Sequence, residues 1–266
     1  IVGTCTSVLT EMLAIADQMD DKPDAEAIAE WWQQIDQWRA DKGIYTASRY
    51  EPSAGTCIKP QDVIKMLYKI TNGEAIVTSD VGQHQMFAAQ YYLFDKPRTW
   101  INSGGLGTMG FGLPAAMGCK RAFPDTDVAC VTGEGSIQMC IQELSTCTQH
   151  NLPVKIINLN NAALGMVRQW QELFFDERLS GVDMVGNPDF VKLAESYGVK
   201  AFRMSSSDDV AKVWEEALAY NDGPCLIEAV CNKTDNVYPM IPAGANYDKM
   251  LLEAPETKLE KPTGST

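Results

Sequence analysis

The sequence predicts an α/β fold in which about six parallel strands form one sheet with helices on both faces. Short apolar runs alternate along the chain with stretches whose apolar residues recur every three or four positions. The clearest alternation is an apolar run from Val128 to Val131, a helical spacing from Ser136 to Cys147, and a second apolar run from Val154 to Leu159. A strand, a helix and a strand within this length indicate a right-handed parallel unit.

The first 57 residues are expected to precede the sheet. Ile1 to Gly3 indicate a short strand, Val8 to Met19 a helix and Asp20 to Asp24 a charged linker. A second helix is expected from Ala25 to Asp41, followed by a connection, 43–57, without a strong period. The apolar residues near one side of the second helix are interpreted as packing residues: Ile28, Trp31, Trp32, Ile35 and Trp38.

Strands and helices then alternate as far as the polar tail. The expected strands are Ala75–Thr78, Thr99–Asn102, Val128–Val131, Val154–Leu159 and Cys225–Cys231. The expected helices are Pro60–Thr71, one opening at the turn Ser79–His84, Leu113–Phe123, Ser136–Cys147, one beginning at Gly165, Asn187–Gly198 and Asp208–Tyr220. Pro60 suits a first helical turn, and Ser136 and Ser207 are predicted caps.

Polar residues follow two neighbouring strands of the predicted sheet. Glu134 comes after the run that ends at Val131, and Asn161 after the run that ends at Leu159. Ligands of parallel sheets bind beyond the carboxyl ends of the strands, so a carboxylate and an amide oxygen are expected to converge there. Such oxygens suit a hard cation, and the sequence therefore predicts a Mg²⁺ site.

The segment Ser103 to Gly112 holds five glycines in ten residues. Gly105, Gly107 and Gly110 match the dinucleotide-binding pattern, but a lone match is weak, and the sequence has no phosphate loop with its lysine. Glycine permits close approach of the backbone to a ligand, and Met109 is the bulky residue at the centre of the loop. A diphosphate bound here would be neutralised by a metal and backbone N–H groups.

Composition excludes several classes of partner. The net charge of −13 argues against nucleic acid and anionic membranes, and no run of eighteen apolar residues is present. With 266 residues and 45% hydrophobic content, the chain can bury at least one full core. The eight cysteines form no metal-spaced pair. Several occupy apolar positions, which favours buried thiols in a reducing cytoplasm: Cys119, Cys130, Cys140 and Cys147.

The Gly-acid-Gly motif and the later Asn-Asn pair are similar to the general signature of thiamine diphosphate enzymes. In addition, five segments resemble one family among these enzymes, the catalytic large subunit of acetohydroxyacid synthase, also called acetolactate synthase. They are SDVGQHQMFAAQ (79–90), NSGGLGTMGFGLPAA (102–116), GEGSIQMCIQELSTC (133–147), NNAALGMVRQWQ (160–171) and VYPMIPAGA (237–245). These segments follow one another in order over most of residues 58–250. Since the chain also begins without Met, we expect a piece of a longer polypeptide.

The resemblance implies a Rossmann-like thiamine diphosphate-binding domain over 58–250. Residues 1–20 would end a preceding middle domain, 21–57 would be a linker with a helix, and 251–266 a tail. The implied cofactors are thiamine diphosphate and Mg²⁺, with FAD only in the full-length family enzyme. Glu134, Asn161 and the backbone carbonyl of Ala163 would bind the metal. The implied cofactor contacts are Gln83, His84, Gly107, Met109, Gly135, Ser136, Gly165 and Met166, and Trp170 would shape the pocket for the second 2-keto acid.

One departure from the common thiamine signature concerns the metal. The acid of that signature is usually Asp, whereas position 134 is Glu. The extra methylene moves the carboxylate outward, and Mg²⁺ tolerates little distortion of its octahedron. Either the loop shifts to compensate or the metal site is weaker.

The implied reaction condenses pyruvate with a second 2-keto acid with loss of CO₂, in branched-chain amino acid biosynthesis. The resemblance also implies a homodimer or tetramer, a small regulatory subunit, and a cytoplasmic location, or an organelle in a eukaryote. The activating glutamate of the family lies in a separate N-terminal domain, so no catalytic residue is expected in this chain and the isolated chain is expected to be inactive.

Two alternatives remain open. One is the same domain of another thiamine enzyme, such as an oxidase, decarboxylase or glyoxylate carboligase, against which GMVRQWQ and VYPMIPAGA favour the synthase. The other is a non-catalytic binding module, for which Glu134 is the only hint.

Overall fold

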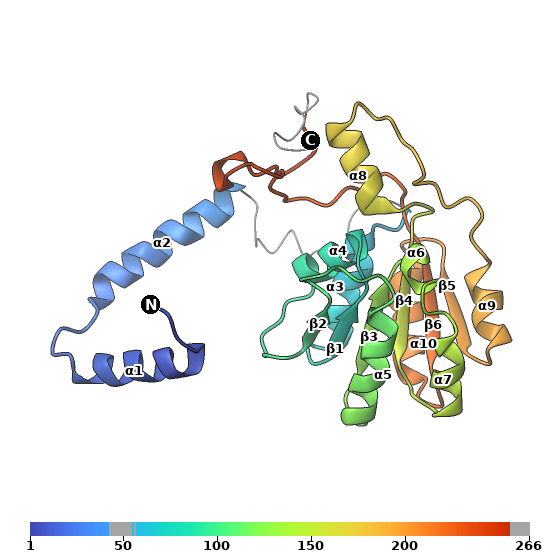
Figure 1. Ribbon diagram of the computed structural model, residues 1–266, viewed down its shortest axis with the longest axis horizontal. Helices are drawn as coiled ribbons and strands as arrows, with labels where there is room; N and C mark the ends of the chain where they lie inside the picture. Colours follow the sequence, from blue (N-terminus) through green and yellow to red (C-terminus); the bar gives the residue numbers. More distant parts are fainter. Residues whose placement is uncertain (43–54, 56, 256–266) are drawn as a thin grey trace. The chain divides into compact units, whose positions relative to one another are not determined.

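The computed structural model describes residues 1–42, 55 and 57–255. The chain divides between Arg49 and Tyr50 into two compact units, within the stretch that was expected to be a linker. The first unit contains the helices α1 (Cys5–Gln18) and α2 (Ala25–Lys42) (Figure 1). The predicted strand at Ile1–Gly3 is wrong, because no described segment pairs with these residues. The helix begins earlier than expected, capped by the Thr4 side chain, which accepts the N–H of Ser7 at 3.4 Å.

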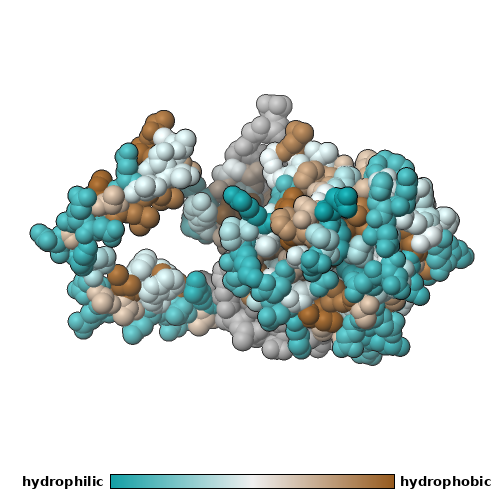
Figure 2. All heavy atoms as spheres, turned by 90° about the horizontal axis from the view of Figure 1, so that it is seen from below, coloured by the Kyte–Doolittle hydropathy of each residue, from teal (hydrophilic) through white to brown (hydrophobic). Residues whose placement is uncertain are grey.

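The apolar side of α2 is not buried in this unit. Trp31, Trp32 and Trp38 leave 57%, 52% and 51% of their surface exposed, so their interpretation as packing residues is wrong for the described structure. The rings of Trp31 and Trp38 contact one another edge to face, 5.5 Å apart. Figure 2 shows apolar side chains, in brown, on the surface of this unit. Leu9, Leu13 and Ile28 are among the exposed apolar residues of the two helices.

The second unit is built on six parallel strands in the order β2-β1-β3-β4-β6-β5. Their bounds are β1 (Ile76–Ser79), β2 (Trp100–Asn102), β3 (Val128–Thr132), β4 (Lys155–Asn160), β5 (Lys200–Met204) and β6 (Cys225–Val230). The five strands located from the sequence differ from these bounds by at most one residue at either end. β5 was not located, because it lies at an edge of the sheet and contains exposed and part-buried residues instead of forming an apolar run.

Helices cover both faces of the sheet, as predicted (Figure 1). One face packs against α3 (Pro60–Ile70), α4 (Gln83–Tyr91) and α10 (Asp209–Ala219). The other face packs against α5 (Gly112–Ala122), α6 (Glu134–Ile137), α7 (Glu143–Gln149) and α9 (Phe190–Ser196). Successive strand residues point to opposite faces, so Val131 and Ile157 join the first core whereas Cys130 and Ile156 join the second.

The single helix predicted from Ser136 to Cys147 is instead the pair α6 and α7. Hydrogen bonds between residues three apart, such as the N–H of Glu143 to the carbonyl of Cys140, join the two helices. Ile137, Cys140, Leu144 and Cys147 are all buried in the second core at spacings of three, four and three residues, so the pattern resembles one continuous helix.

Neither serine that was expected to cap a helix does so. The Ser136 hydroxyl lies within α6 and donates to the carbonyl of Val81 at 3.1 Å, and the Ser207 hydroxyl donates to the carbonyl of Gly55 at 2.6 Å. At the start of α10, the Asp209 carboxylate accepts the N–H groups of Ser205 and Ser206 instead, both at 2.9 Å.

A small third core joins α8 (Gly165–Phe174) to the C-terminal segment. Leu173, Phe174 and Met240 are buried in it, and Met240 pairs with Leu251 in an antiparallel bridge.

All eight cysteines are free thiols. Cys130, Cys140 and Cys147 are buried, as expected, and Cys119 is half-buried. Among the described helices, none combines the length and the apolarity needed to cross a bilayer.

Candidate functional site

A cavity of about 210 Å³ lies beyond the carboxyl ends of β1, β3 and β4. Residues that the sequence singled out come together around it from four separate segments. They are Gln83 and His84, Gly107 and Met109, Glu134 to Ser136, and Asn161, Ala163, Gly165 and Met166. β3 and β4 are in register, with Thr132 opposite Asn158, which brings the loops after both strands to one edge. Trp170 does not line the cavity; its ring packs against Phe174 in the third core, with centroids 5.1 Å apart.

Glu134 and Asn161 converge on a single backbone donor. Oε1 of Glu134 accepts the N–H of Ala163 at 2.6 Å, and Oδ1 of Asn161 accepts the same N–H at 3.2 Å. Two oxygens that accept the same N–H lie close to each other, as two ligands of one cation must. Within the described ranges, no three His, Cys, Asp or Glu side chains are placed to bind a metal, so the candidate metal site depends on this carboxylate, this amide and the backbone.

Glu134 is 2% exposed. Burial raises its pKa from 4.5 to about 7, because water no longer solvates the charge. Backbone N–H groups, including that of Ala163, offset part of this rise, and the negative charge of Glu228 adds to it. A buried carboxylate of this kind would be stabilised by a cation.

Glycines allow the side chains around the cavity to approach the backbone closely. A Cβ on Gly165 would lie 2.0 Å from Oε1 of Gln83, and a Cβ on Gly133 would lie 2.8 Å from Nδ1 of His84. A Cβ on Gly135 would lie 2.7 Å from a methyl carbon of Leu164. Glycine is therefore needed at these three positions because a larger residue would overlap its neighbours.

His84 lies in the first turn of α4 and lines the cavity. It is 8% exposed, and Nε2 has no hydrogen-bond partner among the described residues. Burial lowers its pKa from 6.5 to about 3, although a hydrogen bond to the backbone of Asp80 opposes the shift. The ring is therefore neutral in this structure and carries one N–H.

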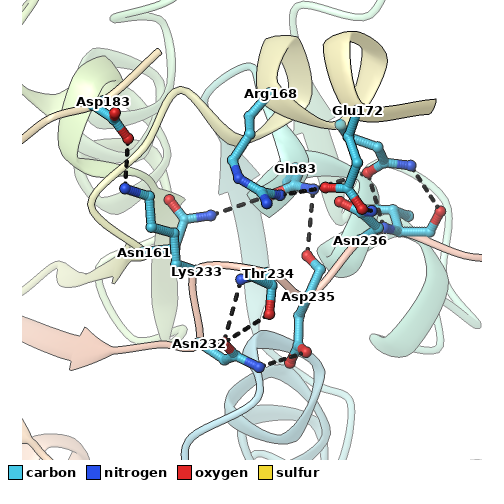
Figure 3. A network of polar contacts seen from close by, with 12 residues as sticks. Gln83, Asn161, Arg168, Glu172, Asp183, Asn232, Lys233, Thr234, Asp235 and Asn236 are labelled. Atoms are coloured by element: carbon cyan, nitrogen blue, oxygen red, sulfur yellow. Dashed lines mark hydrogen bonds and ion pairs between the residues drawn. The ribbon is translucent and has the colours of Figure 1, made fainter. Parts of the chain in front are cut away.

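The polar atoms of Gln83 contact protein groups. Its Nε2 donates to Oε1 of Gln169 at 2.8 Å and to the carbonyl of Asp235 at 3.3 Å, and its Oε1 accepts from Nδ2 of Asn161 at 3.2 Å (Figure 3). Gln83 thus lines the cavity while its amide is engaged elsewhere. Sequence reasoning did not single out Gln169, since nothing local to α8 distinguishes it from a core or surface glutamine.

The glycine-rich loop is clamped to the strand ends by side chains that the sequence analysis also missed. Oδ1 of Asp80 accepts the N–H of Gly112 at 2.8 Å, and Oδ2 accepts the Thr132 hydroxyl at 2.6 Å. The Thr78 hydroxyl donates to the carbonyl of Gly112 at 2.9 Å. Asp80 follows a buried strand, just as Glu134 does. This position could have identified Asp80 from the sequence as a residue of the site.

A comparison with known protein families matches the part of the chain that contains the cavity. Residues 80–229 match the thiamine pyrophosphate enzyme family, at its C-terminal TPP binding domain. The chain belongs to this family. The matched range of the thiamine pyrophosphate enzyme domain includes all the predicted site residues, from Gln83 to Trp170.

Among individual thiamine pyrophosphate enzymes, the chain is similar to acetolactate synthases. It is 49% identical over 258 residues to acetolactate synthase isozyme 3 large subunit of Escherichia coli, an alignment that covers 96% of this chain and 44% of that protein. It is 46% identical to acetolactate synthase large subunit of Haemophilus influenzae, with 96% and 44% covered, and 42% identical to acetolactate synthase large subunit IlvB1 of Mycobacterium tuberculosis, with 94% and 40% covered. The chain thus spans less than half the length of these relatives.

Proposed function

We propose that this chain is the cofactor-binding portion of an acetolactate synthase, which condenses pyruvate with a second 2-keto acid with loss of CO₂. The observation that carries the proposal is the convergence of Glu134 and Asn161 on the N–H of Ala163 at the ends of β3 and β4. The similarity to acetolactate synthases supports this reaction over that of another thiamine enzyme.

The residues around the cavity suit thiamine diphosphate and Mg²⁺. Glu134, Asn161 and the carbonyl of Ala163 would bind the cation, which would neutralise the buried carboxylate. The unpaired Nε2 of His84 is a buried polar atom at the cavity. The negative charge of a bound diphosphate would favour the protonated imidazole, whose Nε2–H would donate to a phosphate oxygen. Gly135 and Ser136, after β3, would also contact the diphosphate. When bound, thiamine diphosphate supplies the electron sink through which a 2-keto acid loses CO₂ and joins a second one.

The remaining cavity residues would position the organic part of the cofactor. The Gly107 backbone and Met109 would contact its rings from the glycine loop, and Gly165 and Met166 from the start of α8. Trp170 lies one helical turn beyond Met166 and would act on a substrate only from outside the cavity described above. FAD in another part of a longer polypeptide, a dimer or tetramer, a small regulatory subunit and a cytoplasmic location remain predictions from the resemblance.

Calorimetry with thiamine diphosphate and Mg²⁺ tests the proposal. We expect binding that needs the cation, and a loss of affinity of about tenfold or more in Glu134→Ala, equal to about 1.4 kcal/mol. Glu215→Ala is the matched control, because Glu215 is an exposed glutamate of α10 away from the cavity. Equal affinity in Glu134→Ala and wild type, or no cation-dependent binding at all, would overturn the proposal.

A further inference from the structure

Three buried amides form a chain between the candidate metal site and the segment 235–240 (Figure 3). Nδ2 of Asn161 donates to Gln83, and Nε2 of Gln83 donates in turn to Oε1 of Gln169. Gln169 then pairs with the backbone of Val237 on both sides: its Oε1 accepts the Val237 N–H at 2.9 Å, and its Nε2 donates to the Val237 carbonyl at 3.1 Å.

This chain has a direction, because one end of an amide only donates and the other only accepts. Oε1 of Gln169 accepts from both Gln83 and Val237, so Gln83 must turn its NH₂ group toward α8 and its oxygen toward Asn161. That oxygen holds the NH₂ group of Asn161. Oδ1 of Asn161 consequently faces the N–H of Ala163, beside the Glu134 carboxylate.

The orientation of Asn161 matters for a cation. If the amide turned over, an NH₂ group would occupy the place of Oδ1, and an NH₂ group does not bind a cation. Gln83 is itself confined, since its oxygen lies where a side chain on Gly165 would begin. Two acceptors fix the direction of the Gln83 amide: Oε1 of Gln169 at 2.8 Å and the carbonyl of Asp235 at 3.3 Å. Gln169 makes the shorter of these bonds and is the side chain that connects Gln83 to Val237.

We propose that Gln169 is a positioning residue for the metal site. Through Gln83 it sets the amide of Asn161 so that oxygen faces the cation, and it links this arrangement to the docking of residues 235–240 on α8. The inference rests on the proposed role of Asn161 as a metal ligand.

Further contacts hold the segment 235–240 beside Gln169. Nδ2 of Asn236 donates to Oε1 of Glu172 at 3.0 Å, and Oε2 of Glu172 pairs with Arg168 at 2.7 Å. Val237 is fully buried, and Met240 belongs to the third core. Because the segment and the metal site share one set of hydrogen bonds, cation binding and docking of the segment stabilise each other.

The test compares two glutamines of the same helix. Gln169→Met keeps the length of the side chain and removes its hydrogen bonds. Gln171→Met is the matched control, because Gln171 also pairs with backbone on both sides, at Ser180, with bonds of 2.9 Å and 3.1 Å, but has no contact with Gln83. Mn²⁺ titration followed by electron paramagnetic resonance, with thiamine diphosphate present, measures cation affinity without any turnover.

We expect Gln169→Met to weaken Mn²⁺ binding about tenfold, as is usual when a group that orients a metal ligand is lost, and Gln171→Met to leave it unchanged. We also expect Mn²⁺ with thiamine diphosphate to slow hydrogen exchange at the Val237 N–H in wild type and in Gln171→Met, but not in Gln169→Met. A purely structural role for Gln169 would lower stability without removing this response to the cation.

Equal Mn²⁺ affinity in wild type and Gln169→Met would overturn the inference and leave the proposed function intact. Failure of the wild type to bind Mn²⁺ would instead count against the proposed function. If Gln169→Met does not fold, Gln169→Asn is used; it keeps an amide in the buried position but withdraws it from Gln83, and it carries the same expectation.

Discussion

The Glu134 side chain connects two loops at the candidate metal site. The longer acid was expected either to shift the loop or to weaken the metal site. In the structure the side chain spans the gap between the loops after β3 and β4, and its oxygen accepts the N–H of Ala163 at 2.6 Å. The turn that offers this N–H contains Ala162 in the left-handed region, at φ 54°, with its own N–H bonded to Oδ1 of Asn160 at 3.1 Å. Glu134 thus connects the loops after β3 and β4, and its effect on the metal site stays a prediction.

Gly165 provides a prediction at the scale of the residue. In Gly165→Ala the new methyl group would overlap the Gln83 oxygen and contact Nδ2 of Asn161 at 2.8 Å. We expect the free energy of unfolding to fall by about 1–3 kcal/mol, the usual cost of overpacking, with weaker cation binding. Urea denaturation and Mg²⁺ titration measure the two effects.

Gly118→Ala is the control for that substitution. Gly118 lies in the interior of α5, and a Cβ there would meet no atom within 4 Å. Alanine at this position should raise the free energy of unfolding by up to about 1 kcal/mol through helix propensity. If the two variants behaved alike, close packing at Gly165 would not be the reason for glycine there.

At the scale of the element, two strand ends hold the glycine-rich loop. Asp80 and Thr78 bind opposite sides of Gly112, one its N–H and the other its carbonyl. Burial raises the pKa of Asp80, and the hydrogen bonds from Thr132 and Gly112 oppose that rise. Gly107 and Gly110, at φ 76° and 88°, adopt backbone conformations that other residues rarely take. The position of Met109 therefore follows from anchors on β1 and β3.

Thr78→Val tests this anchoring. The substitution keeps the shape of the side chain and removes the hydroxyl that donates to the Gly112 carbonyl. Because this carbonyl also belongs to the hydrogen-bond pattern of α5, we expect the net cost of one hydrogen bond, about 0.5–1.5 kcal/mol of unfolding free energy. We also expect faster hydrogen exchange in the loop, measured by mass spectrometry on peptides that contain Met109. Thr99→Val removes a similar hydroxyl-to-carbonyl bond of 2.8 Å at an exposed site, and it should change neither quantity appreciably. Unchanged loop exchange in Thr78→Val would show that β1 does not anchor the loop.

At the scale of the whole molecule, the cavity and all three buried cores belong to the second unit. Deletion of residues 1–49 should therefore leave the melting temperature of the sheet domain and its Mg²⁺-dependent binding of thiamine diphosphate within experimental error. Differential scanning calorimetry and titration of the shortened chain measure both. Loss of folding on deletion would mean that the exposed apolar residues of α1 and α2 support the second unit.

The sequence by itself determined the parallel sheet, its two helical layers and the edge at which the cavity lies. These features depend on local patterns: apolar runs mark buried strands, three- and four-residue spacings mark helices, and a parallel sheet brings the loops after its strands to one edge. Glu134, Asn161 and the glycine loop could be assigned to that edge for this reason. The same local patterns could not show that Ser136 lies inside a short helix, that β5 completes an edge of the sheet, or that the α2 tryptophans remain exposed.

Only the tertiary structure decided which atoms of these residues face one another. Gln83 and Gln169 are 86 positions apart in the sequence, and Gln169 and Val237 are 68 apart, so no periodicity relates them. The direction of their amides depends on how many donors and acceptors meet in a buried space, where an unpaired polar group is costly. Such matching is a property of the packed molecule, because each partner is supplied by a different element of the fold.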